Sequence, residues 1–318
     1  MENKEKPRKL TDNEQTIFEL SERIVAAQHP IRVLDAIKWG DDIKAEFFKH
    51  NFRKLPPVNK EYYKKIPIGF DPAKKIEEFF SIEHDIKKKL GKYGPVSDLM
   101  QHRCREYRDV AHLLQMRGEH KFSEIAQDLY GSTEDAFYAG APTLKDLANV
   151  VCNALTHIKD QTHCEKDEKT YTAQQGVDFL TKKLANFFGN TDEFHVKVSD
   201  NIVSDASAGA DTIKLRSDLK FSERVLRLYE VHEGWVHLGT TMNGMMQPIC
   251  TFLSKGPPSC TVTQEGLAML TEIFTFSSYP DRVKRITNRI VSINMAEEGA
   301  NFIDVFRFFR EQGIGDEE

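Results

Sequence analysis

Apolar residues recur at helical spacing through the first half of the chain. Thr11 and Glu14 have the spacing of a capping box, and the apolar residues after them predict a helix that ends near His29. Further helices are predicted at residues 39–50, 73–90, 96–117, 143–158 and 172–188, separated by turns rich in proline or charge. This half of the chain therefore reads as helical.

The periodicity changes at Glu193, where apolar and polar residues begin to alternate. Residues 194–198 and 213–215 follow this two-residue period and predict two strands. The segment between them is rich in small and polar residues, which is typical of a hairpin connection or an irregular loop. Helical patterns then resume to the end, so the predicted fold class is α+β, predominantly helical, with a small β-sheet.

Composition narrows the class of protein. Apolar residues make up 40% and charged residues 29% of the 318 positions, which is the balance of a soluble globular protein. No apolar run approaches the roughly 20 residues of a membrane span, and the polar start lacks a secretory signal, so we expect a cytoplasmic protein without a membrane partner. A net charge of -5, with both signs mixed along the chain, predicts no nucleic-acid partner.

The segment HEGWVH carries the clearest chemistry. It lies near the end of a helix predicted from Ser222 to Gly239, and His232 and His237 offer two imidazoles beside the carboxylate of Glu233. Residues five apart on an α-helix point about 140° away from each other, so both histidines can face one metal only if the helix is distorted. We therefore predict an irregularity from Gly234 to His237.

Glu265 is the candidate for a third ligand. It follows the segment PPSCT and is predicted in the first turn of a helix, with Gly266 removing a side chain beside the site. Glu272 lies two turns later on the same face, where it could orient a histidine. The alternative is an ordinary helix with partly buried histidines, in which Glu265 pairs with the helix dipole and Glu272 is solvated.

Several segments resemble a known family. HEGWVH is similar to the HExxxH of the QEGLA-motif proteins, which include tyrosine carboxypeptidase-like zinc metallopeptidases and bacterial members described as flavohaemoglobin expression modulators. TQEGLAML contains the signature itself, NGMMQP resembles the family's NGxxQP, and similarity extends to RGEHKFSEIAQDLYG and HPIRVLDAIKW. The resemblance spans nearly the whole chain.

This resemblance implies both a fold and a reaction. It implies a zincin-like metallopeptidase core in which one Zn²⁺ is held by His232, His237 and Glu265. Glu233 would be the general base toward a zinc-bound water, and the substrate would be a peptide or protein C-terminus that loses one residue, aromatic in the characterised members. We expect a polar tail over residues 1–10 and a single catalytic domain over 11–318, mainly helical at 11–190 and carrying the zinc site at 191–318.

Three further residues are candidates for binding such a substrate. Arg216 on the second predicted strand could pair with a terminal carboxylate, although a solvated strand arginine is the alternative. Asn243 and Tyr279 could donate hydrogen bonds to the oxyanion or the peptide backbone, although each residue type also serves in turns and packing. These three residues are the predicted substrate-binding residues.

The same motifs are also compatible with two other functions. The chain could be a regulatory or binding protein that retains a structural zinc, or a zinc hydrolase that acts on a non-peptide amide. Members of the family usually continue beyond FRFFREQG, so we also expect a family C-terminal segment to be lacking here. An intact Glu233 favours the peptidase, and the sequence carries no signal of the oligomeric state.

Overall fold

The computed structural model describes residues 9–161, 167–189, 193–200, 202, 204–209 and 211–316. Most of the predicted polar tail lies outside these residues. Helices dominate the described chain, as predicted, and the capping box of Thr11 and Glu14 opens the first of them. The first seven are α1 (Asp12–Gln28), α2 (Val33–Ile37), α3 (Asp41–Lys49), α4 (Lys60–Lys64), α5 (Pro72–Leu90), α6 (Pro95–Gln115) and α7 (His120–Tyr130).

The first hydrophobic core lies among α1, α5 and α6. Its fully buried members include Leu20 of α1, Phe79 of α5 and Met100 of α6. A short 3-10 helix from far along the chain, η2 (Thr251–Ser254), inserts Phe252 into the same core. The backbone N–H of Phe252 donates to the Ser21 hydroxyl over 2.8 Å, so this later segment is fixed to the N-terminal helices.

A second core forms around α9 and the larger of two sheets. Helix α8 (Leu144–Gln161) precedes this core in the sequence, and α9 (Ala173–Phe188) begins at a capping box of Thr172 and Gln175. The core combines apolar side chains of α9 with those of the sheet and of the helices that follow. The apolar face expected on α8 is only partly covered, because Val150 and Val151 are exposed.

Both predicted strands form, but their connection is not a hairpin. Strand β2 (His195–Ser199) runs parallel to β4 (Thr212–Arg216), while β3 (Ala206–Ala208) pairs antiparallel with the other edge of β4. The intervening segment thus contributes a strand of its own and leaves β3 at the edge of the three-stranded sheet. A second sheet pairs β1 (Tyr171–Thr172) with β5 (Lys220–Phe221).

The remaining helices carry the candidate chemistry and close the molecule. They are α10 (Glu223–Tyr229), the π-helix η1 (Glu230–Leu238), α11 (Gly239–Met245), α12 (Pro258–Phe274), α13 (Pro280–Glu297) and α14 (Phe302–Glu311). Phe302 and Phe306 of α14 each make an edge-to-face contact with Phe47 of α3, with ring centroids 5.1 Å apart in both pairs. The last helix is thereby joined to the N-terminal helices.

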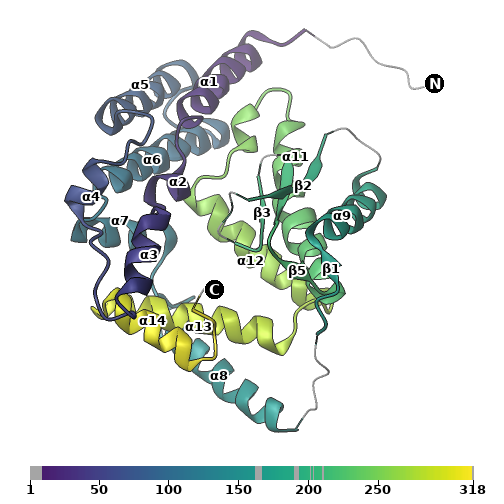
Figure 1. The fold of residues 1–318 in the computed structure, drawn as a ribbon. Helices are drawn as coiled ribbons and strands as arrows, with labels where there is room; N and C mark the ends of the chain where they lie inside the picture. The colour runs from purple at the N-terminus through teal and green to yellow at the C-terminus, as the bar shows by residue number, and fades with distance from the viewer. Residues whose placement is uncertain are drawn as a thin grey trace.

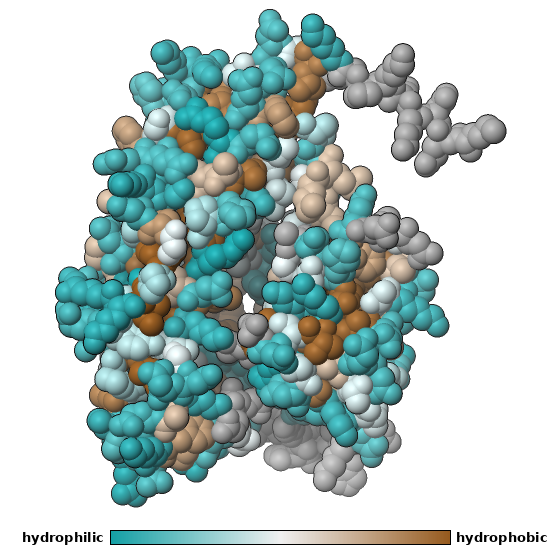
Figure 2. Space-filling model, turned by 45° about the horizontal axis from the view of Figure 1, so that its top comes forward, coloured by the Kyte–Doolittle hydropathy of each residue, from teal (hydrophilic) through white to brown (hydrophobic). Residues whose placement is uncertain are grey.

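The arrangement places α12 in the middle of the molecule. Helices α1 to α7 lie along one side, the sheets and α9 lie on the other, and α12 crosses between them (Figure 1). Figure 2 shows a hollow between these two parts, and hydrophilic residues over much of the outer face. Within the described part of the chain, no helix combines the length and the apolar character needed to cross a membrane.

Candidate metal centre

The two motif histidines lie on a π-helix, as their spacing requires. The distortion predicted at Gly234 to His237 is present and extends over the nine residues Glu230–Leu238. The backbone N–H of Gly239 reaches the carbonyl of Gly234, a bond five residues back. Since this pattern makes residues five apart near neighbours along one face, His232 and His237 approach each other with ring centroids 4.9 Å apart.

Gly234 has a steric role in this helix. A Cβ atom added there would lie 2.4 Å from Cδ2 of Leu184, which is fully buried in α9. The glycine therefore permits close packing of the π-helix on α9. This contact holds the π-helix against the second hydrophobic core.

Glu265 of α12 completes a cluster with the two histidines. Its carboxylate oxygens lie 3.6 Å from Nε2 of His232 and 3.4 Å from Nε2 of His237. The three candidate ligand atoms all lie within 4.8 Å of one another. His232 is buried, whereas the Glu265 side chain is 53% exposed, so the cluster is open to solvent on the side of α12.

The other ring nitrogen of each histidine meets an oxygen acceptor from α12. Nδ1 of His232 lies 2.7 Å from Oε1 of Glu272, and Nδ1 of His237 lies 3.1 Å from Oε1 of Gln264. These acceptors favour a proton on Nδ1, which leaves the Nε2 lone pair directed at the cluster. The structure thus brings Glu272 to the position predicted for it.

Arg282 stands behind Glu272. Its Nη2 donates to Oε1 of Glu272 over 3.1 Å, and its Nε lies 3.4 Å from Oε2. The Glu272 side chain is only 1% exposed, and an unpaired carboxylate at such a depth is strongly disfavoured. Burial opposes its charge, but hydrogen bonds from His232 and Arg282 outweigh burial and hold the pKa of Glu272 below its usual value.

Glu233 lies beside the edge of the sheet. One of its carboxylate oxygens accepts the backbone N–H of Ala208 in β3 over 2.9 Å. This N–H points away from β4, because Asp205 and Gly209 make the backbone bonds to that strand. The hydrogen bond fixes Glu233 without making it a member of the three-residue ligand cluster.

Comparison with protein-family models agrees with this geometry. The model described as microtubule-associated tyrosine carboxypeptidase matches residues 45–318, which include every residue of the cluster. The chain belongs to this family. No curated protein and no solved structure matches it.

Members of the microtubule-associated tyrosine carboxypeptidase family are metallopeptidases, and the cluster fits a zinc ion. Zinc ligand atoms at about 2.0–2.1 Å in tetrahedral geometry lie about 3.4 Å from one another. Oε2 of Glu265 lies 3.6 Å from Nε2 of His232, and Oε1 lies 3.4 Å from Nε2 of His237, so each oxygen is near this distance from one imidazole. With one atom taken from each residue, the three candidate ligand atoms lie within 4.8 Å of one another. Two nitrogens and one carboxylate oxygen also form a donor set that zinc accepts, with a fourth position left for another ligand.

Without a metal, the charged forms of His232 and of the carboxylates beside it stabilise one another. Burial disfavours the charged form of His232, but its interactions with Glu265 and Glu272 prevail and raise the pKa to about 9. The imidazole of His232 is also the largest influence that lowers the pKa of Glu265. A metal ion must therefore displace a proton from His232.

Helix α12 begins earlier than the sequence indicated. Glu265 was predicted in the first turn, but the helix starts at Pro258, so Glu265 lies two turns inside it. Proline fits the first position of a helix, where its missing N–H is not needed. Arg103 of α6 holds this end by contacts with Ser259 and Cys260, and the Ser259 N–H donates to Glu106.

The three predicted substrate-binding residues lie in different settings. Arg216 in β4 donates from Nε to Asp218 over 2.8 Å, so a neighbouring carboxylate already balances its charge. Asn243 is exposed on α11. Tyr279 precedes α13 with the guanidinium of Arg224 5.5 Å from its ring centroid, and burial raises its pKa. Their roles stay predictions.

Sequence reasoning missed the contacts that come from the backbone or from distant turns. Gln264 stands inside the QEGLA segment, so the signature itself could have indicated it. Arg282 and the N–H of Ala208 carry no signal in the sequence. They reach the site through a turn after α12 and through the third strand of the sheet.

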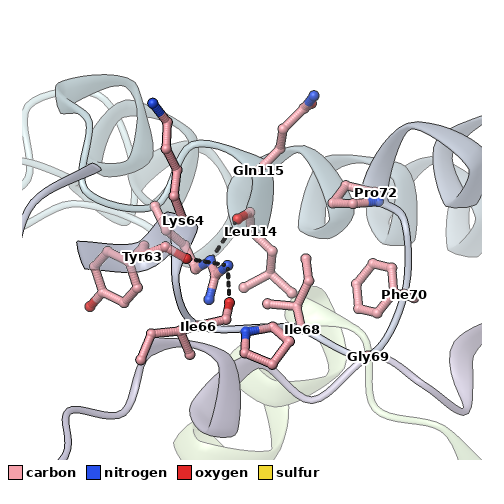
Figure 3. Close-up of a pocket in the computed structure, with 11 residues that line it drawn as sticks. Tyr63, Lys64, Ile66, Ile68, Gly69, Phe70, Pro72, Leu114 and Gln115 are labelled. Atoms are coloured by element: carbon pink, nitrogen blue, oxygen red, sulfur yellow. Dashed lines mark hydrogen bonds between the residues drawn. The ribbon is translucent and has the colours of Figure 1, made fainter. Parts of the chain in front are cut away.

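Two hollows in the described structure lie away from the metal centre. One of about 560 Å³ is bounded by the segment from Tyr63 to Pro72 and by the end of α6 (Figure 3). Arg117 at its wall donates to the backbone carbonyls of Ala36, Tyr63, Leu114 and Ile66. Its guanidinium thus ties α2 and α4 to α6 and acts in packing.

Proposed function

We propose that this chain is a zinc-dependent carboxypeptidase that removes one C-terminal residue, preferentially an aromatic one, from a peptide or protein. The observation that carries the proposal is the position of Glu233: a carboxylate held at a sheet edge beside two histidines and a glutamate with the spacing of zinc ligands. Zinc in such a site polarises a carbonyl and makes water more acidic.

The division of roles follows from the contacts. His232, His237 and Glu265 would hold the metal, while Glu272 and Gln264 orient the two imidazoles. Glu233 accepts a proton from the water that attacks the scissile carbonyl, and it then gives this proton to the leaving amine. Its bond to the Ala208 N–H fixes the orientation of the carboxylate.

The sheet edge suggests how a polypeptide lies in the site. In the described chain, β3 pairs with β4 on one side only, and on its other side the Ala208 N–H donates to Glu233 of η1. An extended substrate can pair with such an edge by main-chain hydrogen bonds. This would place its scissile bond beside Glu233.

The family description suggests the compartment and the kind of substrate. It names microtubule association and tyrosine. A cytoplasmic protein that ends in tyrosine is therefore the proposed substrate, and neither a nucleic acid nor a membrane has a role in the reaction. The proposed set for the substrate's carboxylate and oxyanion remains Arg216, Asn243 and Tyr279.

Mass spectrometry of a peptide library after incubation with the zinc-loaded protein tests the proposal. Loss of single C-terminal residues, strongest for aromatic ends, is the expected result. Internal cleavage would indicate an endopeptidase. If the peptides stay intact while a parallel set of non-peptide amides is cleaved, the chain is the other hydrolase. Zinc binding without any turnover would favour a regulatory protein with a structural metal.

A further inference from the structure

Helix α12 exposes an apolar surface directly beside the candidate metal ligand. The side of the helix that carries Glu265 and Glu272 faces the π-helix, and part of α12 also contacts α7. Next to Glu265, the helix presents large apolar side chains that are 38–59% exposed: Val262, Met269, Leu270 and Ile273. Clusters of this kind on a soluble protein mark binding surfaces.

Gly266 lies at the centre of this group. Val262 precedes it by four residues, and Met269, Leu270 and Ile273 follow by three, four and seven, so on a helix all of them surround it. A Cβ atom at Gly266 would meet nothing within 4 Å. The described packing therefore gives no reason for a glycine that weakens the middle of a helix.

The missing side chain leaves a shallow notch with an apolar rim. We propose that the notch around Gly266 binds the aromatic side chain of the substrate's C-terminal residue. Because Gly266 directly follows Glu265, a ring placed there lies beside the metal centre, and the exposed apolar rim supplies the burial that favours an aromatic ring. This inference rests on the proposed carboxypeptidase function.

Two matched substitutions on α12 test it. Gly266→Ala adds one methyl group to the notch, and Thr271→Ala changes a partly exposed residue of the same helix that lies five residues from Gly266 and so points about 140° away from it. Both should raise the melting temperature, because alanine favours helix more than glycine or threonine does. Both should keep the zinc affinity of the unaltered protein, because Glu265 is unchanged.

Cleavage of two peptides, one ending in tyrosine and one in alanine, distinguishes the two variants. With Gly266→Ala, KM for a peptide that ends in tyrosine should rise about tenfold or more, while a peptide that differs only by a terminal alanine should be little affected. Thr271→Ala should cleave both peptides as the unaltered protein does. This pattern would show a stabilised enzyme that has lost room for the ring.

Three results would overturn the inference. They are unchanged KM for the tyrosine peptide in Gly266→Ala, an equal loss for both peptides, or a lower melting temperature in Gly266→Ala. The last result would show that protein, such as a second copy of the chain, already covers this face. If the unaltered zinc-loaded protein cleaves neither peptide, the proposed function itself is wrong, and the inference falls with it.

Discussion

Arg282 and Glu272 form an ion pair at the back of the metal centre, with Nη2 and Oε1 3.1 Å apart and the carboxylate 1% exposed. Glu272 in turn lies 2.7 Å from Nδ1 of His232. The pair links the start of α13 to a metal ligand on the π-helix. Removal of Arg282 would leave a buried carboxylate without its cation.

We expect Arg282→Gln to weaken zinc binding by about 10- to 100-fold, as loss of a partner behind a ligand typically does. Competition with a chromophoric chelator measures the affinity. Arg282→Lys should recover part of it, and Arg289→Gln, which changes an exposed arginine of the same helix, should bind zinc normally. Equal affinities for Arg282→Gln and Arg289→Gln would contradict the role assigned to Arg282.

The Ala208 N–H should matter for catalysis more than for stability. Ala208→Pro removes the donor to Glu233 but no bond to β4, because this N–H faces away from that strand. A hydrogen bond to a charged group contributes about 1.5–3 kcal/mol, so kcat should fall about 10- to 100-fold.

Ser207→Pro is the matched control. Asp205 and Gly209 make backbone hydrogen bonds to β4, and because this pattern alternates along a strand, the Ser207 N–H also faces β4. It should lower the melting temperature more than Ala208→Pro does. A kcat for Ala208→Pro equal to that of the unaltered protein would contradict the claim that the Ala208 N–H positions Glu233 for catalysis.

The metal-free protein should lose stability as the pH rises. In the folded chain the pKa of His232 is raised from 6.5 to about 9, so protonation favours the folded state. This contribution is fully present below pH 6.5 and disappears as the pH rises through about 9. Thermal melts of metal-free protein over this interval should show a falling melting temperature, and His232→Gln should flatten the dependence.

Gly244 should tolerate no side chain. A Cβ atom there would lie 2.4 Å from the backbone carbonyl oxygen of Leu253 in η2, and backbone cannot move aside as a side-chain end can. Gly244→Ala should therefore destabilise the fold by about 1–3 kcal/mol in urea unfolding. Stability equal to that of the unaltered protein would show that η2 is not packed as closely on α11.

The chemistry of the site was more predictable than its supports. Two histidines five residues apart can face one metal only if the helix is distorted, so an irregularity followed from the spacing, while its form, a π-helix of nine residues, did not. Glu272 followed from helical periodicity after Glu265. The contact of Arg282 did not, because it depends on a turn in which Phe276 has a φ of 56° and Ser277 and Ser278 bond back to Glu272.

Strand pairing shows the same division. Alternating residues located β2 and β4, but alternation is identical in parallel and antiparallel pairs and does not fix the partner edge. The third strand contains only Ala206, Ser207 and Ala208, too few and too small to give a pattern. Its contact with Glu233 therefore became visible only in three dimensions.

The most direct test concerns Glu233 itself. Zinc content and hydrolysis of a peptide ending in tyrosine should be measured together for the unaltered protein and for Glu233→Gln. The predicted result is one zinc per chain in both proteins, with release of tyrosine by the unaltered protein alone. Full activity of Glu233→Gln, or loss of zinc from it, would contradict the role of Glu233 as a proton acceptor that does not bind the metal.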